Sequence, residues 1–183
     1  MKAFITGITG MVGSHLAEFL IKETDWEIHG LVRWRSPLDN IENLISRINQ
    51  KKRVFLHYGD LRDPQSLDVV VRDVMPDYTF HLAAQSYPKT SFDSPLDTYS
   101  TNILGTSSLL ESLKKYSKES IIHICASSEV FGRVNKKDLP ISEDNIFHPA
   151  SPYAISKIGT DYIAKYYFEA YKLKILIKSI KII

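Results

Sequence analysis

KAFITGITGMVGSHLAEFLI, residues 2–21, decides the fold. The first five residues have the composition of a strand, and they lead into the spaced glycines Gly7, Gly10 and Gly13. In such a loop the glycines permit a tight turn, a close approach of the backbone to a pyrophosphate, and close packing of the following helix on the strand. The helix N-terminus attracts phosphates through its unpaired amides and its dipole. The stretch therefore predicts a strand, turn and helix that bind a dinucleotide, with a ligand-free glycine turn as the alternative.

In the rest of the chain, short apolar runs alternate with longer amphipathic stretches, which is the pattern of βαβ units. We expect strands at residues 2–6, 27–32, 53–58, 78–82, 120–125 and 174–178. We expect helices at residues 11–22, 38–49, 64–74, 95–117 and 151–171. Right-handed crossovers then give a doubly wound parallel sheet of the Rossmann type, an α/β fold with three α/β/α layers. Ligands bind such sheets outside the carboxyl ends of the strands.

Length and composition narrow the class of protein. A chain of 183 residues suits one core, so we expect a single domain over residues 1–183. The 23 basic and 21 acidic groups nearly cancel, and the net charge of +2 gives no electrostatic case for nucleic acid. Neither an apolar run of about 20 residues nor a signal pattern is visible. We therefore expect a soluble, cytoplasmic protein that binds neither nucleic acid nor membrane.

Cysteine and histidine give no sign of a metal site. The lone Cys125 excludes an internal disulfide, and it stands in an apolar run where we expect a buried structural thiol. His81 and His123 fall on predicted strands, where a hydrogen-bonded core or edge residue is the simpler interpretation. No metal is therefore predicted.

The segments after the predicted strands carry candidate cofactor contacts. Arg33 follows the second strand, where an acidic residue would serve NAD, so NADP is favoured over NAD; the alternative is that Arg33 is a solvated loop charge. Asp60 follows the third strand and could accept a hydrogen bond from an adenine amino group, while Asp63 is placed to cap a helix that begins at Pro64. The fourth strand is followed by small residues, which allow the backbone to approach a ribose and nicotinamide. The segment comprises Leu82, Ala83, Ala84, Gln85 and Ser86.

Tyr153 and Lys157 form the candidate base. Their spacing of four residues puts both groups on one face of a helix, where the ammonium favours the phenolate. Ser127 and Glu129 follow the fifth strand, at the end of the sheet where the tyrosine helix begins. A serine can hydrogen-bond a substrate oxygen whose charge changes, and a glutamate can act as a second acid or base. The alternative is that Ser127 caps the end of the strand and that Glu129, Tyr153 and Lys157 are surface groups.

With these motifs assembled, the chain resembles an extended short-chain dehydrogenase/reductase, and within that superfamily it is similar to the GDP-mannose 4,6-dehydratases. The motifs that carry the resemblance are TGITGMVGSHLAEFL, HGLVRWRS, GDLRD, HLAAQS, ASSEVFG and SPYAISK. The resemblance spans nearly all of residues 1–172.

The resemblance implies a tightly bound NADP and assigns parts of it to particular residues. Arg33 would hold the 2′-phosphate, Asp60 and Leu61 the adenine side, and residues 82–86 the inner ribose. The glycine loop that would hold the pyrophosphate comprises Gly7, Ile8, Thr9, Gly10, Met11, Val12 and Gly13.

The resemblance also implies a reaction on GDP-mannose. Tyr153 would remove the C4 hydroxyl proton as hydride passes from C4 to NADP⁺, and Ser127 would steady O4, where the family usually has threonine. Glu129 would remove the C5 proton as water leaves C6, and the hydride would return to C6. Lys157 would bind the nicotinamide ribose and lower the pKa of Tyr153. The product would be GDP-4-keto-6-deoxymannose.

The chain departs from the family pattern in several places. Met11 and Val12 replace polar residues of the glycine loop, and Asp97 stands at an aromatic cofactor contact, although Tyr99 lies close by. The family continues after the sixth strand into a smaller domain that grips the sugar nucleotide. We therefore expect the cofactor-binding portion alone, with the substrate domain missing.

Other functions on the same scaffold stay open. An NDP-sugar 4-epimerase needs no C5 base, so Glu129 argues against it, whereas a 4-keto reductase is harder to separate. A non-catalytic NADP-binding module is the alternative from another class. Full-length relatives pair through helices equivalent to residues 95–117 and 151–171, which suggests a homodimer.

Overall fold

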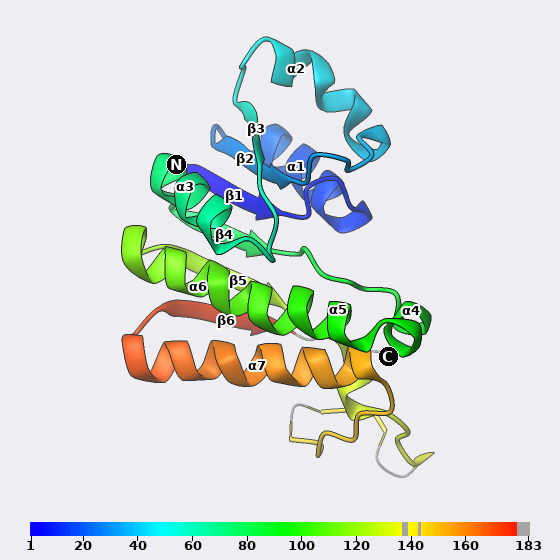
Figure 1. Cartoon of the computed structure of the whole chain (residues 1–183). Helices are drawn as coiled ribbons and strands as arrows, with labels where there is room; N and C mark the ends of the chain where they lie inside the picture. Colours follow the sequence, from blue (N-terminus) through cyan, green and yellow to red (C-terminus); the bar gives the residue numbers. More distant parts are fainter. Residues whose placement is uncertain (137–138, 143, 179–183) are drawn as a thin grey trace.

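A six-stranded parallel sheet forms the centre of the computed structural model, which describes residues 1–136, 139–142 and 144–178 (Figure 1). The strand order is β3-β2-β1-β4-β5-β6, so the order reverses between β1 and β4. The strands are β1 (Lys2–Thr6), β2 (Glu27–Val32), β3 (Val54–Tyr58), β4 (Tyr78–His81), β5 (Ile121–Cys125) and β6 (Lys174–Lys178). This arrangement confirms the predicted doubly wound Rossmann sheet.

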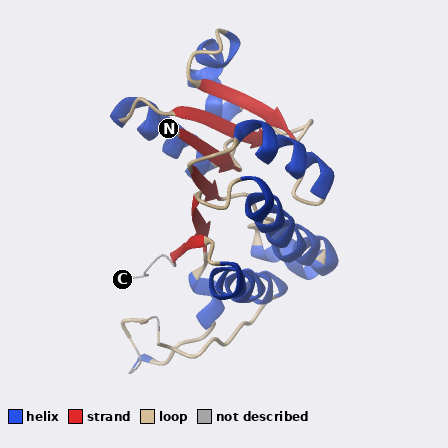
Figure 2. Cartoon of the chain, turned by 90° about the vertical axis from the view of Figure 1, so that its left-hand side faces the viewer, coloured by secondary structure: helices blue, strands red, loops and turns tan. Residues whose placement is uncertain are grey.

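Helices lie against both faces of the sheet (Figure 2). The α-helices are α1 (Met11–Glu23), α2 (Ile45–Asn49), α3 (Pro64–Val74), α4 (Pro88–Asp93), α5 (Pro95–Tyr99), α6 (Gly105–Tyr116) and α7 (Pro152–Tyr171). The described residues also form two 3₁₀ turns, η1 (Asp39–Leu44) and η3 (Ser128–Phe131), and a π-helical segment, η2 (Ser100–Leu104). Helices α3, α6 and α7 share one apolar core with the sheet, and α1 and η1 share the other.

Local capping explains where α3 and α7 begin. The Asp63 carboxylate accepts hydrogen bonds from the amides of Gln65 and Ser66, with Pro64 at the first helical position. Ser151 caps α7 in the same way, because its hydroxyl accepts from the amide of Ala154. The predicted cap at Asp63 is confirmed.

Two predicted helices have a different structure. Residues 38–49 form a 3₁₀ turn followed by the short α2, since the buried Ile41 and Leu44 are spaced by three residues, which suits a 3₁₀ turn. Residues 95–117 are α5, η2 and α6 in succession, with a π-type hydrogen bond from the Gly105 amide to the Ser100 carbonyl. Helix α4 and the turn η3 were not predicted. The remaining elements match their predicted bounds to within one residue, and β1, β2, α3 and β6 match at both ends.

Several smaller predictions have mixed outcomes. Cys125 is only partly buried, so the expectation of a buried thiol is wrong: the residue ends β5 at the edge of the core. Among the described residues, no helix is long and apolar enough to cross a membrane, and no cluster of histidine, cysteine and carboxylate side chains could hold a metal. Residues 179–183 of the predicted single domain lie outside the described residues.

His81 is a hydrogen-bonded core residue, as predicted. Its ring nitrogens lie 2.8 Å from the Thr6 hydroxyl and 2.9 Å from the Thr106 hydroxyl, so it joins β1, β4 and α6. Burial lowers the pKa of His81 to about 3, and the charge of Lys157 acts in the same direction. The folded chain therefore holds this imidazole neutral.

We expect acid to weaken the fold through His81. The unfolded chain protonates this histidine below about pH 6.5, whereas the folded chain resists protonation to about pH 3, so stability is complete above this window and falls within it. The loss is on the order of 4 kcal/mol. Urea unfolding across this pH range gives the free energy of unfolding at each pH. This free energy should fall less steeply with decreasing pH for His81→Asn than for the wild type. The exposed His15→Asn serves as the control, and equal slopes for all three proteins would refute the assignment.

The glycine loop sets how closely α1 approaches β1. A Cβ on Gly13 would lie 2.2 Å from the carbonyl oxygen of Gly7, and Gly7 itself has φ +77°. Because the neighbour is backbone, it cannot rotate away. The first turn of α1 therefore packs on the loop through a glycine that no other residue can replace without a shift.

Gly13→Ala should lower the free energy of unfolding by about 2–3 kcal/mol, because overpacking against backbone forces α1 outward. Gly159→Ala in α7 is the matched control: its Cβ would meet the end of the flexible Ile103 side chain at 2.9 Å, and alanine favours a helix, so we expect a change within about 1 kcal/mol. Urea unfolding measures both. Equal destabilisation by the two changes would contradict the packing argument.

Candidate functional site

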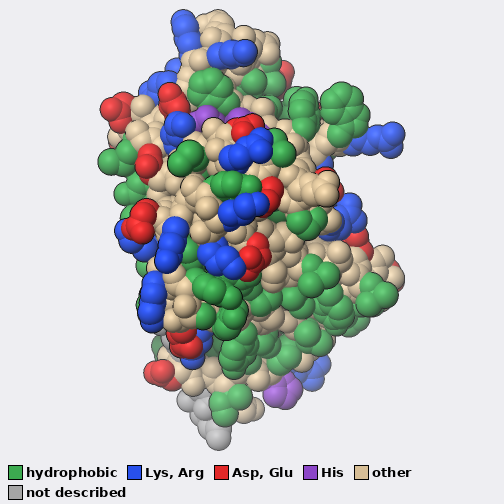
Figure 3. Space-filling model, turned by 60° about the vertical axis from the view of Figure 1, so that its left-hand side comes forward, with side chains coloured by type: hydrophobic (Ala, Val, Ile, Leu, Met, Phe, Trp, Pro, Cys, Tyr) green, Lys and Arg blue, Asp and Glu red, His purple; other side chains and the backbone are tan. Residues whose placement is uncertain are grey.

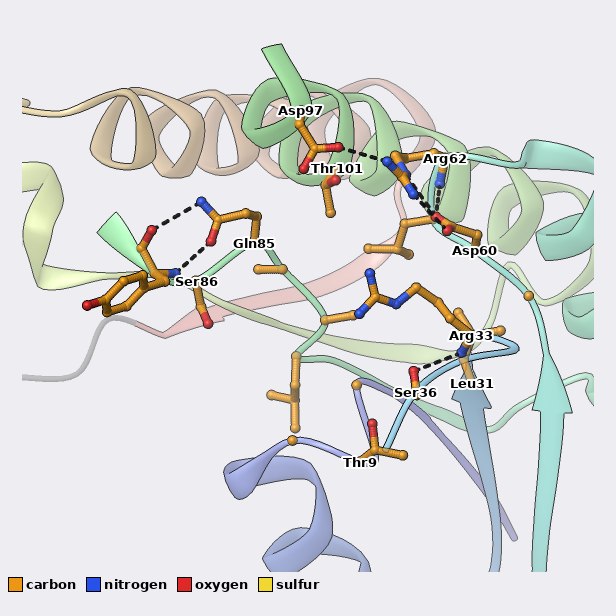
Figure 4. Close-up of a pocket in the computed structure, with 18 residues that line it drawn as sticks. Thr9, Leu31, Arg33, Ser36, Asp60, Arg62, Gln85, Ser86, Asp97 and Thr101 are labelled. Carbon is orange, nitrogen blue, oxygen red and sulfur yellow. Dashed lines mark hydrogen bonds and ion pairs between the residues drawn. The ribbon is translucent and has the colours of Figure 1, made fainter. Parts of the chain in front are cut away.

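A cavity of about 450 Å³ opens at the carboxyl ends of the strands, where the strand order reverses (Figure 4). Its volume is within the range of small-molecule sites. The predicted cofactor residues that line it are Gly7, Thr9, Gly10, Arg33, Asp60, Leu61, Leu82, Ala83, Ala84, Gln85 and Ser86. The lining residues that were not predicted to bind cofactor are Leu31, Ser36, Gly59, Arg62, Tyr87, Asp97 and Thr101.

The glycine loop contributes backbone rather than side chains to the cavity. Ile8 is fully buried beneath the loop, whereas Met11 and Val12 are exposed, and none of the three lines the cavity. Gly10 precedes α1 without a side-chain cap or an acidic group in the first turn. The helix therefore offers uncapped amides and the positive end of its dipole at the loop, which suits a phosphate.

Arg33 enters the cavity from the end of β2. Figure 4 shows its side chain extending inward between Ser36 and Arg62. A tight turn presents it: the Arg33 amide donates to the Ser36 hydroxyl at 3.3 Å, and the Ser36 amide donates to the Arg33 carbonyl at 3.0 Å. A guanidinium and a hydroxyl together at this point are groups that can hold a phosphate.

Asp60 is bound to a neighbouring arginine, which the sequence motif did not predict. Arg62 donates to Asp60 Oδ1 through its amide at 2.9 Å and its Nε at 3.3 Å, and to Oδ2 through Nη2 at 3.2 Å. Burial raises the pKa of Asp60, but the hydrogen bonds and charge of Arg62 outweigh burial and hold the pKa below its usual value. The carboxylate therefore faces the cavity ionised.

The loop after β4 is held by a buried asparagine that the sequence analysis missed. Asn102 Oδ1 accepts from the Gln85 amide at 2.8 Å, and its Nδ2 donates to the Gln85 carbonyl at 3.0 Å. The same Nδ2 donates to the Ser156 hydroxyl at 2.8 Å, and Ser156 donates to the Tyr153 carbonyl at 2.7 Å. The cavity wall is thus joined to the first turns of α7. A polar residue within an amphipathic helical pattern was the only sequence signal.

Tyr153 and Lys157 lie on the same face of α7, as the spacing predicts, and both are buried at 7% and 8% exposure. The Lys157 ammonium donates to the Cys125 carbonyl at 2.9 Å and lies 6.0 Å from the centre of the Tyr153 ring. Ser127 precedes the turn η3 and caps it, because its hydroxyl accepts from the Glu129 amide at 3.2 Å. Ser127 and the exposed Glu129 both lie close enough to Tyr153 to affect its pKa.

The pKa of Tyr153 corrects one prediction. Burial raises this pKa above its usual value, the hydrogen bond from Ser127 opposes the rise, and the charge of Glu129 adds to it. The sequence analysis expected Lys157 to lower the pKa of Tyr153. The ammonium instead binds the Cys125 carbonyl, and burial lowers the pKa of Lys157 itself. The four predicted catalytic residues thus gather at the end of β5, outside the lining of the cavity.

Comparison with known proteins finds a family model and several curated proteins that are similar to this chain. A family model described as GDP-mannose 4,6 dehydratase matches residues 4–180. The GDP-mannose 4,6 dehydratase of Drosophila melanogaster is 38% identical over 177 residues, which cover 93% of this chain and 44% of that protein. The GDP-mannose 4,6-dehydratase of a Vibrio cholerae O1 strain is 39% identical over 175 residues, which cover 92% of this chain and 46% of that protein. The chain thus spans about half the length of these curated relatives.

Solved structures agree on the fold. The dTDP-glucose 4,6-dehydratase of Streptomyces venezuelae, solved with NAD bound, has a TM-score of 0.85 and 26% identity over 98% of this chain and 55% of that one. The UDP-glucose 4-epimerase of Thermotoga maritima, solved with UDP-glucose, has a TM-score of 0.84 and 26% identity over 97% of this chain and 54% of that one. The family model, which matches nearly the whole chain, shows that the chain belongs to the GDP-mannose 4,6-dehydratase family.

Proposed function

We propose that this chain is the NADP-binding portion of a GDP-mannose 4,6-dehydratase, a lyase that forms GDP-4-keto-6-deoxymannose. The observation that carries the proposal is the joining of two sites: a cavity of about 450 Å³ at the carboxyl ends of the strands, and a cluster of Ser127, Glu129, Tyr153 and Lys157 that is connected to it through Asn102. The family match supports the reaction class. We propose that residues 1–183 act as one nucleotide-binding domain.

The cavity suits NADP better than NAD. The glycine loop and the uncapped start of α1 would hold the pyrophosphate, while Arg33 and Ser36 would hold a 2′-phosphate. Asp60 and Leu61 would receive the adenine, and residues 82–86 the inner ribose. When bound, the nicotinamide supplies the chemistry of accepting a hydride and returning it.

The side chains around Tyr153 would handle the protons of the sugar. Tyr153 would take the proton of the C4 hydroxyl, and Ser127, which lies beside it, would hold the sugar oxygen. Glu129 is exposed and close by, and it would remove the proton at C5. Lys157 would orient the nicotinamide ribose from its buried position on α7. Burial raises the pKa of Tyr153, so action as a base at neutral pH would require a positive charge closer to the phenol than Lys157, whose Nζ lies 6.0 Å from the ring centre.

A 4-epimerase or 4-keto reductase is the alternative on this scaffold, since 4-epimerases share its fold at TM-scores near 0.84. The carboxylate of Glu129 favours the dehydratase, because oxidation and reduction at C4 alone need no base for C5.

We also place the protein in the cytoplasm and propose that two copies pair through α6 and α7. Hydrophobic side chains gather on the lower half of the surface in Figure 3, and Tyr162 and Tyr166 of α7 are exposed.

Arg33→Ala should weaken NADP⁺ binding by about 10-fold to 100-fold, because a charge-assisted phosphate contact contributes about 1.5–3 kcal/mol. NAD⁺ binding should change by less than about threefold, since NAD⁺ has no 2′-phosphate for Arg33 to hold. Calorimetric titration of both dinucleotides measures the effect. Arg35→Ala is the control, as Arg35 belongs to the same turn but does not line the cavity. Equal losses for NADP⁺ and NAD⁺ would refute the role of Arg33.

Tyr153→Phe should lower the formation of 4-keto product from GDP-mannose by about 100-fold or more, since the change removes the proton acceptor. NADP⁺ affinity should stay within about threefold. Absorbance in alkali follows the product. Tyr162→Phe, an exposed position on the same helix, should leave turnover unchanged. Product formation by Tyr153→Phe at the wild-type rate would refute this role of Tyr153.

A further inference from the structure

Arg62 joins two carboxylates that come from different parts of the chain. It is bound to Asp60 in its own loop and, through Nη1, to Asp97 Oδ1 of α5 at 2.7 Å. Figure 4 shows the guanidinium between these two groups at the edge of the cavity. All three residues line the cavity. The bridge therefore joins the end of β3 to α5 along one edge of the cavity.

The bridge leaves Asp60 one place for a further hydrogen bond. Each carboxylate oxygen can accept two hydrogen bonds. Oδ1 already accepts from the amide and Nε of Arg62, whereas Oδ2 accepts only from Nη2. Arg62 contacts the Asp60 carboxylate from one side and fixes its orientation. The remaining acceptor position on Oδ2 therefore points in a fixed direction. A donor bound in the cavity would meet a preorganised acceptor.

The loop does not depend on Arg62 for its fold. Leu61 is buried and packs closely against Gly105: a Cβ added to Gly105 would lie 2.7 Å from the Cβ of Leu61. The Ser66 hydroxyl accepts from the Asp60 amide at 3.1 Å, and Asp63 caps α3. The side chains of Arg62 and Asp97, in contrast, are 46% and 48% exposed. An exposed ion pair contributes little to folding, so we expect its effect on the ligand instead.

We propose that Arg62 is a positioning residue that makes the cavity selective for a base bearing an exocyclic amino group, by orienting Asp60 as the acceptor for that group. Asp97 anchors the guanidinium from the opposite side. This inference rests on the proposed dinucleotide function and names the part of the ligand that the bridge recognises, which is the 6-amino group of adenine. A purine with a carbonyl oxygen at that position would face the carboxylate with a second acceptor.

The test compares NADP⁺ with its hypoxanthine analogue, in which the 6-amino group is replaced by a carbonyl, by calorimetric titration of the chain. The wild type should bind NADP⁺ about 10-fold more tightly than the analogue, since an unpaired buried acceptor is penalised. Arg62→Ala should reduce this preference to about twofold or less. Arg62→Lys keeps the charge without the planar fork, and should recover only part of the preference. Asp97→Asn should give an intermediate value.

Arg72→Ala is the matched control, because Arg72 forms an exposed pair with Asp73 on α3 away from the cavity. It should leave the preference unchanged, and urea unfolding should show every variant folded with an unchanged midpoint. A wild-type preference that persists in Arg62→Ala would overturn the inference while leaving the dinucleotide function standing. Failure of the wild type to bind either dinucleotide would overturn the proposed function itself.

Discussion

The side-chain amide of Asn102 is the interaction on which the candidate site depends. It satisfies both backbone polar groups of Gln85 and also binds Ser156, so three segments separated in sequence meet at one buried group. Leaving a buried backbone amide or carbonyl unpaired costs about 1–3 kcal/mol for each group. A π-type turn is a less regular helix, but it lies in the segment from which Asn102 reaches these partners. The hydrogen bonds gained there outweigh the loss of local regularity.

This interaction explains where sequence reasoning succeeded and where it could not. The strands, the spaced glycines and the capped starts of α3 and α7 are written in local patterns, so they could be predicted. The break between α5 and α6 could not, because its cause lies in partners 17 and 54 residues away from Asn102. The link of Arg62 to Asp97 spans 35 residues and was missed for the same reason. Helical periodicity carries no record of such distant contacts.

The electrostatics of α7 show a second limit. Spacing alone places Tyr153 and Lys157 on one face, and the structure agrees. The direction of the tyrosine pKa depends on burial and on where the ammonium binds, which are properties of the packed chain. Burial opposes charge on both groups, so it raises the pKa of Tyr153 and lowers that of Lys157. A pair that reads as an activated base in sequence is therefore, in the folded chain, a buried phenol beside a lysine bound to a carbonyl.

The cavity is held from two sides by interactions of different character. Asn102 acts from within the core, where its loss would disturb both the cavity wall and α7. Arg62 acts at the exposed edge, where the apolar packing of Leu61 already positions the loop. Changes at the edge can therefore alter what is bound without altering whether the chain folds, since the exposed ion pair contributes little to stability. Selectivity can thus change at such an edge while the buried amide network stays in place.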